Sequence, residues 1–357
     1  MGTGYTIAEI VVYPVKGCRG VSVPSAAISF TGFLFDREWM VVKAENGRAI
    51  TMSRAPKLAL VQPSLPTIAM RGESVPASAT LEINAPGMKA LNVPLRKCPS
   101  TGKARQGERG HIVDVGMPTL KGVYEGQGVD EGPEAAAWFT QYLDIPARLV
   151  RFDPTATKEN RQAEDAPEGY VTGFVNTGQF LFASEASLDK VNSYFTTAPF
   201  PMNRFRPNIV VRGPPSFEED KWRQFTIEHM GTHLNFSYVM NRGMCKVPTI
   251  NQDKPDLENV EPNKVVGVQT MFTFRSGPHV GLEFEKVKKV YFGSYFVCDS
   301  TISTASNSKP HVIDVGDNLN VITTKHDDVS VNHASPKSGS LESNMDLCGP
   351  RPVELMY

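Results

Sequence analysis

Short runs of alternating apolar and polar residues dominate the first 120 positions and predict strands rather than helices. Residues 5–20, YTIAEIVVYPVKGCRG, are rich in β-branched side chains and end in a Pro-Val-Lys-Gly turn. Residues 36–51, DREWMVVKAENGRAIT, predict a hairpin, because Asn46-Gly47 suits a tight turn with positive φ. Residues 79–85 and 89–95 predict two further short strands. The pattern therefore indicates a sheet or barrel with few helices.

A helical period first occurs at residues 132–144, GPEAAAWFTQYLD. Pro133 suits the first helical position, and the apolar residues that follow recur at helical spacing. Residues 146–152, PARLVRF, then predict a return to strand. The charged segment 158–170, KENRQAEDAPEGY, contains Pro and Gly, and it predicts a surface loop that could act as a lid.

A second unit with short strands and one helix is predicted to begin near Thr172. Ser184 is a suitable cap for a helix over residues 184–195. Strands are then predicted at residues 204–213, 221–240, 281–298 and 310–322. From Thr324 onward Ser, Asn, Asp, Lys and Gly prevail, so we expect a disordered tail. The predicted organisation is a β-rich α+β fold with few short helices, divided into an N-terminal domain at 1–155, a second domain at 156–323 and a tail at 324–357.

Composition narrows the class of protein. Of the 357 residues, 40% are hydrophobic and 21% are charged, which is typical of a soluble globular protein. A formal net charge of −1 gives no electrostatic reason to expect nucleic acid or an acidic membrane as a partner. No apolar run reaches the roughly 18 residues that a membrane span needs. The five cysteines are scattered without a C-x-x-C pair, which favours a reducing compartment over a disulfide scaffold: Cys18, Cys98, Cys245, Cys298 and Cys348.

Two motifs suggest chemistry but have simpler explanations. His229 and His233 have the four-residue spacing of zinc ligands on a helix, yet their segment alternates like a hairpin with Gly231 at the bend. We therefore interpret both histidines as turn residues. The glycine-rich residues 122–132, GVYEGQGVDEG, match no phosphate-loop pattern and carry acidic side chains that would repel phosphate. They are predicted to be a flexible connection into the helix that begins at Pro133.

Four separated segments together suggest one anion site. Lys16 and Arg19 stand at the end of the first predicted strand, and Arg37 lies among apolar residues, where a cation needs a partner. Arg206 and Asn208 precede a strand that is expected to be buried. Taken singly, such residues usually contact solvent or a nearby carboxylate. Together, cations from three separated segments beside apolar strands would suit a dianionic phosphate. A thiolate at Cys245 would be stabilised nearby and could bind a soft metal.

Six segments in order resemble the successive signatures of the MOSC superfamily: YPVKGCRG, GFLFDREWMVV, FLFASEASLDKVN, RFRPNIVV, EEDKW and CKVPTINQ. Within it, they are most similar to the stand-alone proteins that resemble the mitochondrial amidoxime-reducing component. The resemblance runs from about Tyr5 to Ile322. It implies an N-terminal β-barrel-like domain followed by the MOSC β-barrel, and it leaves no room for the pyridoxal-phosphate domain of full molybdenum-cofactor sulfurases.

The resemblance also implies a site for molybdenum with molybdopterin between the two domains. By motif, Cys245 corresponds to the molybdenum ligand and to the catalytic position. The remaining expected contacts to the pterin or its phosphate are Lys16, Arg37, Thr177, Arg206, Asn208 and, more weakly, Tyr295. Two departures stand out. Gly17 replaces the serine of related segments, and Met244 replaces the arginine of the usual C-x-R-C pattern, with Arg242 two positions earlier.

The function expected from the resemblance is reduction of N-hydroxylated substrates, such as amidoximes and hydroxylamines, by a molybdenum oxidoreductase. Electrons would come from a separate donor, by family analogy a b-type cytochrome and its NADH-dependent reductase. A non-catalytic carrier of sulfur or cofactor is the first alternative, and a scaffold that has lost its cofactor is the second. No nucleic acid and no membrane span are expected. The expected location is cytoplasmic, with mitochondrial association as the alternative.

Overall fold

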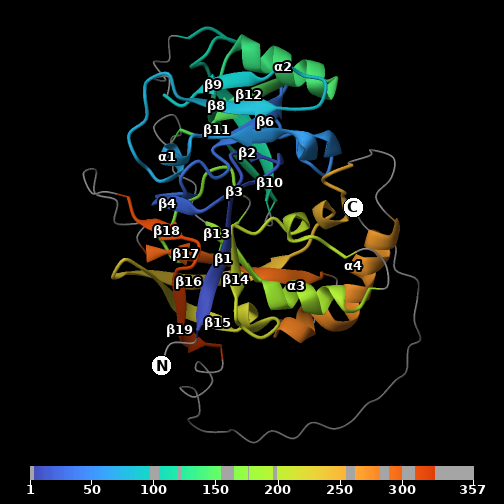
Figure 1. Cartoon of the computed structure of the whole chain (residues 1–357). Coiled ribbons are helices and arrows are strands. Elements are labelled where there is room, and N and C mark those ends of the chain that lie inside the picture. Colours follow the sequence, from blue (N-terminus) through green and yellow to red (C-terminus); the bar gives the residue numbers. More distant parts are fainter. Residues whose placement is uncertain are drawn as a thin grey trace, which may run out of the picture.

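The computed structural model describes residues 4–96, 104–119, 122–153, 165–175, 177–195, 199–254, 262–281, 289–299 and 310–325. Two β-rich units lie one above the other in Figure 1. The loop expected at 158–170 falls largely outside the described residues. So does the expected tail beyond residue 325, whereas Thr324 ends a strand.

Seven strands of the lower unit form a closed barrel. Their order is β14-β13-β17-β16-β15-β19-β1, and a further pairing between β1 and β14 joins the two ends of the sheet. β13 and β14 are parallel, and the other neighbours are antiparallel. The bounds are β1 Tyr5–Val12, β13 Phe180–Ser184, β14 Ile209–Arg212, β15 Trp222–His229, β16 Thr232–Gly243, β17 Tyr291–Cys298 and β19 Asn318–Thr324. The predicted β-rich architecture is thus confirmed, and β1 belongs to this barrel although it begins the chain.

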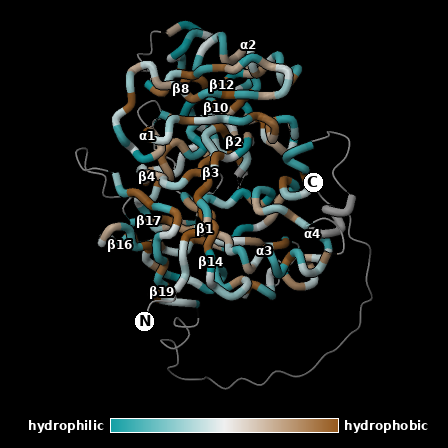
Figure 2. The backbone as a smooth tube through the Cα atoms, in the orientation of Figure 1, coloured by the Kyte–Doolittle hydropathy of each residue, from teal (hydrophilic) through white to brown (hydrophobic). Residues whose placement is uncertain are grey.

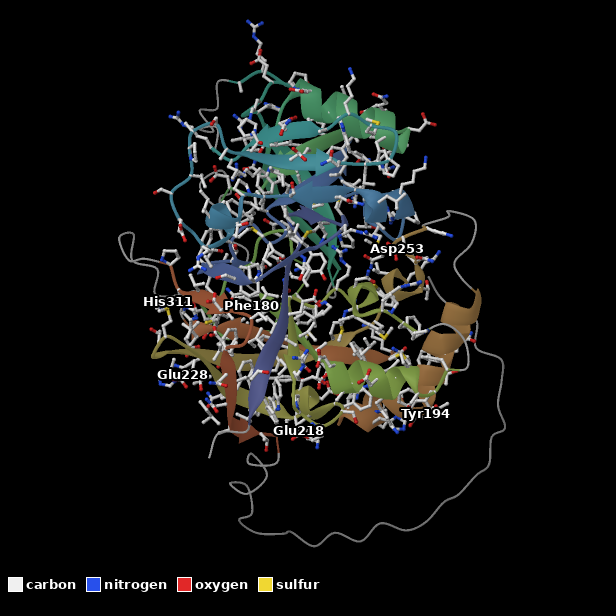
Figure 3. All side chains as sticks on the ribbon, in the orientation of Figure 1. Phe180, Tyr194, Glu218, Glu228, Asp253 and His311 are labelled. Carbon is white, nitrogen blue, oxygen red and sulfur yellow. The ribbon has the colours of Figure 1, made fainter. Side chains whose placement is uncertain are left out.

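Aromatic side chains fill the barrel, as expected for a small barrel whose interior is packed rather than open. Phe182 lies at the centre, with ring centroids 5.1 Å from Phe225, 5.5 Å from Phe236 and 5.2 Å from Phe296. These four rings are fully buried. Phe180, labelled in Figure 3, belongs to the same core. Figure 2 shows the corresponding hydrophobic segments running through the middle of the molecule.

The upper unit consists mainly of two sheets and one long helix. A five-stranded sheet has the order β10-β11-β12-β6-β2, and a three-stranded sheet has the order β7-β8-β9. Their bounds are β10 Ile112–Thr119, β11 Gly122–Asp130, β12 Ala147–Arg151, β6 Trp39–Lys43, β2 Val15–Lys16, β7 Gln62–Ser64, β8 Thr80–Asn84 and β9 Leu91–Pro94. Helix α2, Pro133–Leu143, buries Trp138 and Phe139 in the core that these sheets share. Pro133 stands at its predicted position.

The prediction of a flexible connection at 122–132 is wrong. β11 pairs with β10 along its whole length, from Gly122 opposite Thr119 to Val129 opposite Ile112. Glycine weakens the sequence signal of a strand, but in this sheet it allows close packing. A Cβ at Gly128 would lie 3.1 Å from the side chain of Val150, so the missing side chain makes room for a neighbouring strand.

The remaining elements are small strands, three further helices and 3-10 turns. Small strands connect the units, because β18 pairs with β4 and β3 pairs with β1. Their bounds are β3 Val21–Val23, β4 Ser25–Ser29, β5 Gly32–Phe33 and β18 Val312–Asp314, and the other helices are α1 Thr67–Met70, α3 Glu185–Asn192 and α4 Pro262–Arg275, the last of which was not predicted. Single 3-10 turns lie at η1 Pro56–Leu60, η2 Met202–Arg204, η3 Glu218–Asp220, η4 Val247–Thr249 and η5 Gly277–Val280.

The cap of α3 is built as the sequence predicts, with an addition. Ser184 Oγ accepts a hydrogen bond from Ser187 N at 3.1 Å. Both serine hydroxyls lie within 3.1 Å of the Glu219 carboxylate, which is buried. This burial, together with the neighbouring Asp220, raises the pKa of Glu219 to about 7.

Strands β15 and β16 carry the two histidines that the sequence places at a turn. The two strands form the predicted hairpin, in which Glu228 pairs with His233 and His229 pairs with Thr232. His229 Nδ1 lies 3.0 Å from Asp317 Oδ2, so the imidazole contacts a carboxylate in a neighbouring turn.

Within the described residues, no helix combines the length and the apolar character needed to cross a bilayer.

Candidate active site

A cavity of about 350 Å³ lies where the two units meet, and both contribute to its wall. From the upper unit come β2, the loop before β6 and a loop after Ile50. From the barrel come the segment before β14, the end of β16 and the middle of β17. The side chains that line it are Lys16, Gly17, Arg37, Thr51, Met52, Ser53, Pro118, Val175, Leu181, Phe205, Arg206, Asn208, Arg242, Cys245, Val247 and Tyr295. Six of the seven predicted site residues are therefore brought together.

Tyr13 organises two of the cations. The guanidinium carbons of Arg37 and Arg206 each lie 4.2 Å from the centre of its ring, within the range of a cation–π contact. Arg37 Nη1 also donates to Asp36 Oδ2 at 2.5 Å and to Asn208 Oδ1 at 3.0 Å. The same Asp36 accepts from Tyr13 N at 2.9 Å. One buried carboxylate therefore holds Arg37 but leaves the positive charge of Arg206 without an anionic partner in this cluster.

Arg206 is held in an unfavourable state. It is 9% exposed, and its Nη1 atom has no hydrogen-bond partner in the described part of the chain. Burial, with Arg37 nearby, lowers its pKa to about 10. Its backbone φ of 57° and that of Arg37, 48°, lie in the left-handed region that non-glycine residues seldom adopt. Such strain concentrates at functional sites, and a bound anion would offset the cost of the buried charge.

Lys16 and Asn208 are the predicted site residues whose side chains form hydrogen bonds to the backbone of the protein. Lys16 is 8% exposed and donates from Nζ to Phe174 O at 2.8 Å. Asn208 Nδ2 donates to Val11 O at 3.2 Å, while its Oδ1 accepts from Leu181 N and from Arg37. The Asn208 amide therefore joins β1 to β13 and positions Arg37, a role that motif reasoning did not suggest.

Thr177 is the predicted residue that does not line the cavity. It is 1% exposed, and its Oγ1 has no partner among the described residues. Tyr295, on β17, does line the cavity. A Cβ at Gly178 would come within 2.8 Å of the Tyr295 Cβ, so the segment beside Thr177 packs directly on β17.

Cys245 stands just after β16 and is exposed, unlike the buried Cys18 and Cys298. Arg242, three residues earlier, lines the same cavity and is 7% exposed, and its Nη1 has no partner within the described part of the chain. Met244 takes no part in the lining. It packs against the apolar cluster around Phe205 and Phe292, which accounts for an apolar residue at this position.

Arg19 does not join the site, contrary to the sequence interpretation. Its guanidinium forms an ion pair with Asp253 and donates to Gln252 O at 3.1 Å. Asp253 marks the boundary between the two units in Figure 3. Arg19 thus ties the upper unit to the segment that follows Cys245. Two contributors were missed altogether, Tyr13 and Asp36, although both lie within the segments YPVKGCRG and GFLFDREWMVV.

Comparisons with known proteins match both units. The family model described as the MOSC N-terminal beta barrel domain matches residues 4–146, and the one described as the MOSC domain matches residues 169–320. The "Mitochondrial amidoxime reducing component 2" of Rattus norvegicus is 31% identical over 81% of this chain and 81% of its own length. The "Mitochondrial amidoxime-reducing component 1" of Homo sapiens is 29% identical over 87% and 81%. The "Molybdenum cofactor sulfurase" of Danio rerio is 27% identical over 89% of this chain but 34% of its own length.

Proposed function

The chain belongs to the MOSC superfamily, and we propose that it is a molybdenum-cofactor-dependent oxidoreductase that reduces N-hydroxylated substrates, with Cys245 as the molybdenum ligand. The observation that supports this most is the cavity itself. It combines an accessible thiol with the cationic side chains of Lys16, Arg37 and Arg206 at the junction of the two domains. This chemistry suits a soft metal next to a phosphorylated pterin.

The residues present fit such a cofactor. The buried Nη1 atom of Arg206 has no partner among the described residues, so it can donate to an anionic ligand without losing another bond. Within the described residues no group of three or more His, Cys, Asp or Glu side chains forms a metal site. A metal bound through Cys245 would take its other ligands from the cofactor, as a pterin dithiolene provides.

When bound, the cofactor would supply the two-electron redox chemistry that removes oxygen from the N-hydroxyl group. Overall, an amidoxime, two electrons and two protons give an amidine and water. The chain's own residues bind and orient: Cys245 would hold the metal, while Arg37 and Arg206 would hold the phosphate. Lys16 would add a third charge at that end. The electrons would come from an external donor, with a b-type cytochrome and an NADH-dependent reductase as the pair to test first.

A non-catalytic carrier of sulfur or cofactor is the alternative, and one observation favours it. Met244 packs against an apolar cluster at the position where the resemblance to the family leads us to expect the arginine of C-x-R-C, so that cation next to the cysteine is missing. A carrier would keep the cofactor without turning over substrate.

The proposal is tested with full-length protein made in a host that synthesises the cofactor. Molybdenum is measured by mass spectrometry and pterin by the fluorescence of its oxidised form. Benzamidoxime reduction is then followed with reduced methyl viologen as donor. Stoichiometric metal with turnover supports the oxidoreductase. Stoichiometric cofactor without turnover favours the carrier, and neither metal nor pterin contradicts both. Cell fractionation would separate the cytoplasmic from the mitochondrial location.

A further inference from the structure

Arg242 is the cation in the cavity whose role neither the fold nor the proposed cofactor site explains. It is 7% exposed, and no described residue forms an ion pair with it. Its Nη1 atom is fully buried and has no hydrogen-bond partner among the residues that the structure describes. Leaving a guanidinium buried without an anion is costly, so this arrangement is expected where a ligand supplies the missing charge.

Strand geometry directs this side chain into the cavity. Regular pairing of β16 with β17 breaks twice near its end, between Tyr238 and Met240 and again between Asn241 and Gly243. Such irregularities re-aim side chains and often lie beside active sites. As a result, Asn241 and Arg242 are both buried although they are consecutive. Asn241 Nδ2 donates to Ser294 Oγ at 3.3 Å on one side, whereas Arg242 lines the cavity on the other.

The other cations form a separate group. Arg37 and Arg206 both lie against Tyr13, and Arg37 contacts Arg206 O and the Asn208 side chain. Arg242 makes none of these contacts. It comes instead from the segment that bears Cys245, with only Gly243 and Met244 between them. A molecule that reacts next to Cys245 therefore meets Arg242, whereas a phosphate held by the Tyr13 group does not require it.

We propose that Arg242 is a specificity residue that binds a carboxylate of the substrate beside Cys245, so that the preferred N-hydroxylated substrates are anionic. The inference rests on the proposed reductase function. Its chemistry is that of an oxyanion held by a guanidinium, which carboxylate and phosphate share. The experiment must therefore separate a substrate carboxylate from the cofactor's phosphate.

The kinetic test compares benzamidoxime with its 3- and 4-carboxylate derivatives, using the cofactor-loaded full chain and reduced methyl viologen. Four proteins are needed: the parent, Arg242→Gln, Arg242→Lys and Arg212→Gln. Arg212 lies on β14 with a largely exposed side chain that pairs with Glu185, so it controls for the loss of a charge far from the cavity. We expect Arg242→Gln to raise KM for a carboxylate substrate by about ten- to a hundredfold, the range of one charge-assisted hydrogen bond. Its kcat and its kinetics with benzamidoxime should change little, and Arg242→Lys should restore part of the loss.

A binding measurement adds a readout that is independent of turnover. Calorimetric titration with benzoate and with benzamide should show that the parent prefers benzoate and that Arg242→Gln removes this preference. Pterin content should be equal in the two proteins. The melting temperature of Arg242→Gln should equal or exceed that of the parent, because an unpaired buried charge is removed.

The outcomes separate the two proposals. An equal loss with neutral and anionic substrates, or a fall in pterin content, would assign Arg242 to the cofactor and overturn the inference. Unchanged kinetics with the carboxylate derivatives would overturn it too. Arg242-dependent benzoate binding in a protein that turns over neither substrate would support the anion site while contradicting the reductase.

Discussion

At the scale of single residues, the site is a set of cations oriented mainly by uncharged groups, although Arg37 also pairs with the carboxylate of Asp36. Tyr13 contributes its ring to Arg37 and Arg206, and burial raises its own pKa to about 12, so it remains a neutral phenol. Its hydroxyl donates to Pro207 O at 3.1 Å, next to Arg206. The residues that orient the cations thus leave their charge available to a ligand.

Cys245→Ser tests the metal ligand. The side chain is exposed, so the fold and the melting temperature should be retained. Benzamidoxime reduction should disappear, because a neutral hydroxyl is a poor ligand for a soft metal. Pterin content should fall less than activity, since Lys16, Arg37 and Arg206 remain. Activity equal to that of the parent would contradict the assignment.

Cys18 supplies the control for this variant. It is fully buried in the upper core, and burial raises its pKa to about 12, so it is a neutral thiol. Cys18→Ala is preferable to a serine substitution, which would bury an additional polar group. It should lower stability modestly and leave the metal content and the turnover per bound molybdenum as in the parent.

At the scale of elements, a glycine on β17 allows two barrel strands to pack closely beside the site. Gly293 on β17 has a φ of 75°, and a Cβ there would lie 2.5 Å from Phe182 O, a backbone atom that cannot move aside. The residue allows β17 to pass closely over β13 just before Tyr295 enters the cavity. Gly231, at the β15–β16 turn, has a similar φ of 78° but open space around its Cβ position.

Gly293→Ala and Gly231→Ala form a matched pair that separates backbone strain from steric overlap. The free energy of unfolding of both variants should fall by about 1–2 kcal/mol, because a non-glycine residue is forced into the left-handed region. Gly293→Ala should lose about 1–3 kcal/mol more from overpacking. Urea denaturation measures both free energies of unfolding. Equal losses would show that β17 can shift away from β13.

The cap of α3 predicts a pH dependence. Because burial and Asp220 raise the pKa of Glu219 from 4.5 to about 7, the folded state binds more protons than the unfolded state between those values. Stability should therefore fall as pH rises from about 4.5 to 7, by up to about 3 kcal/mol from this group. Glu219→Gln, which mimics the protonated form, should flatten the melting-temperature profile over this interval.

Glu218→Gln is the neighbouring control. Glu218 pairs with Lys221 at 2.7 Å and lies at the surface end of the same 3-10 turn. Its replacement should leave the pH profile with the slope of the parent. A profile that Glu219→Gln does not change would show that other groups, among them Asp220 and its partner Arg275, dominate the titration.

At the scale of the whole molecule, the expected tail can be separated from the barrel by truncation. A chain that ends after Lys325 keeps β19, which pairs with both β15 and β1. We expect its melting temperature to match that of the full chain, because the composition of residues 326–357 predicts little apolar burial. A chain that ends after Gly316 should lose cooperative unfolding, because the ring opens between β15 and β1. A large drop in melting temperature for the first truncation would contradict the expectation from composition.

Sequence reasoning predicted local features well where one residue determines the geometry, as with Pro133 at a helix start, Ser184 at a cap and Gly231 at a hairpin. It failed where long-range pairing decides. The glycines of β11 gain their strand conformation from β10 and β12, and no local signal reports that partnership. The motifs selected six residues that line one cavity, and the binding roles assigned to them stay predictions. Arg19 and Tyr13 were misjudged because their roles depend on what lies across the boundary between the units.

The pairing of β1 with β19, the last barrel strand in the sequence, has a consequence for biosynthesis. Tyr5 pairs with Leu319, which follows it by 314 residues. At roughly 5–20 residues per second, a ribosome needs about 15–60 s to produce β19 after it has produced β1. Throughout that interval β1 lacks its barrel neighbour β19, so part of its apolar surface stays uncovered. We therefore expect nascent chains arrested before β19 to associate with holdase chaperones through this N-terminal strand.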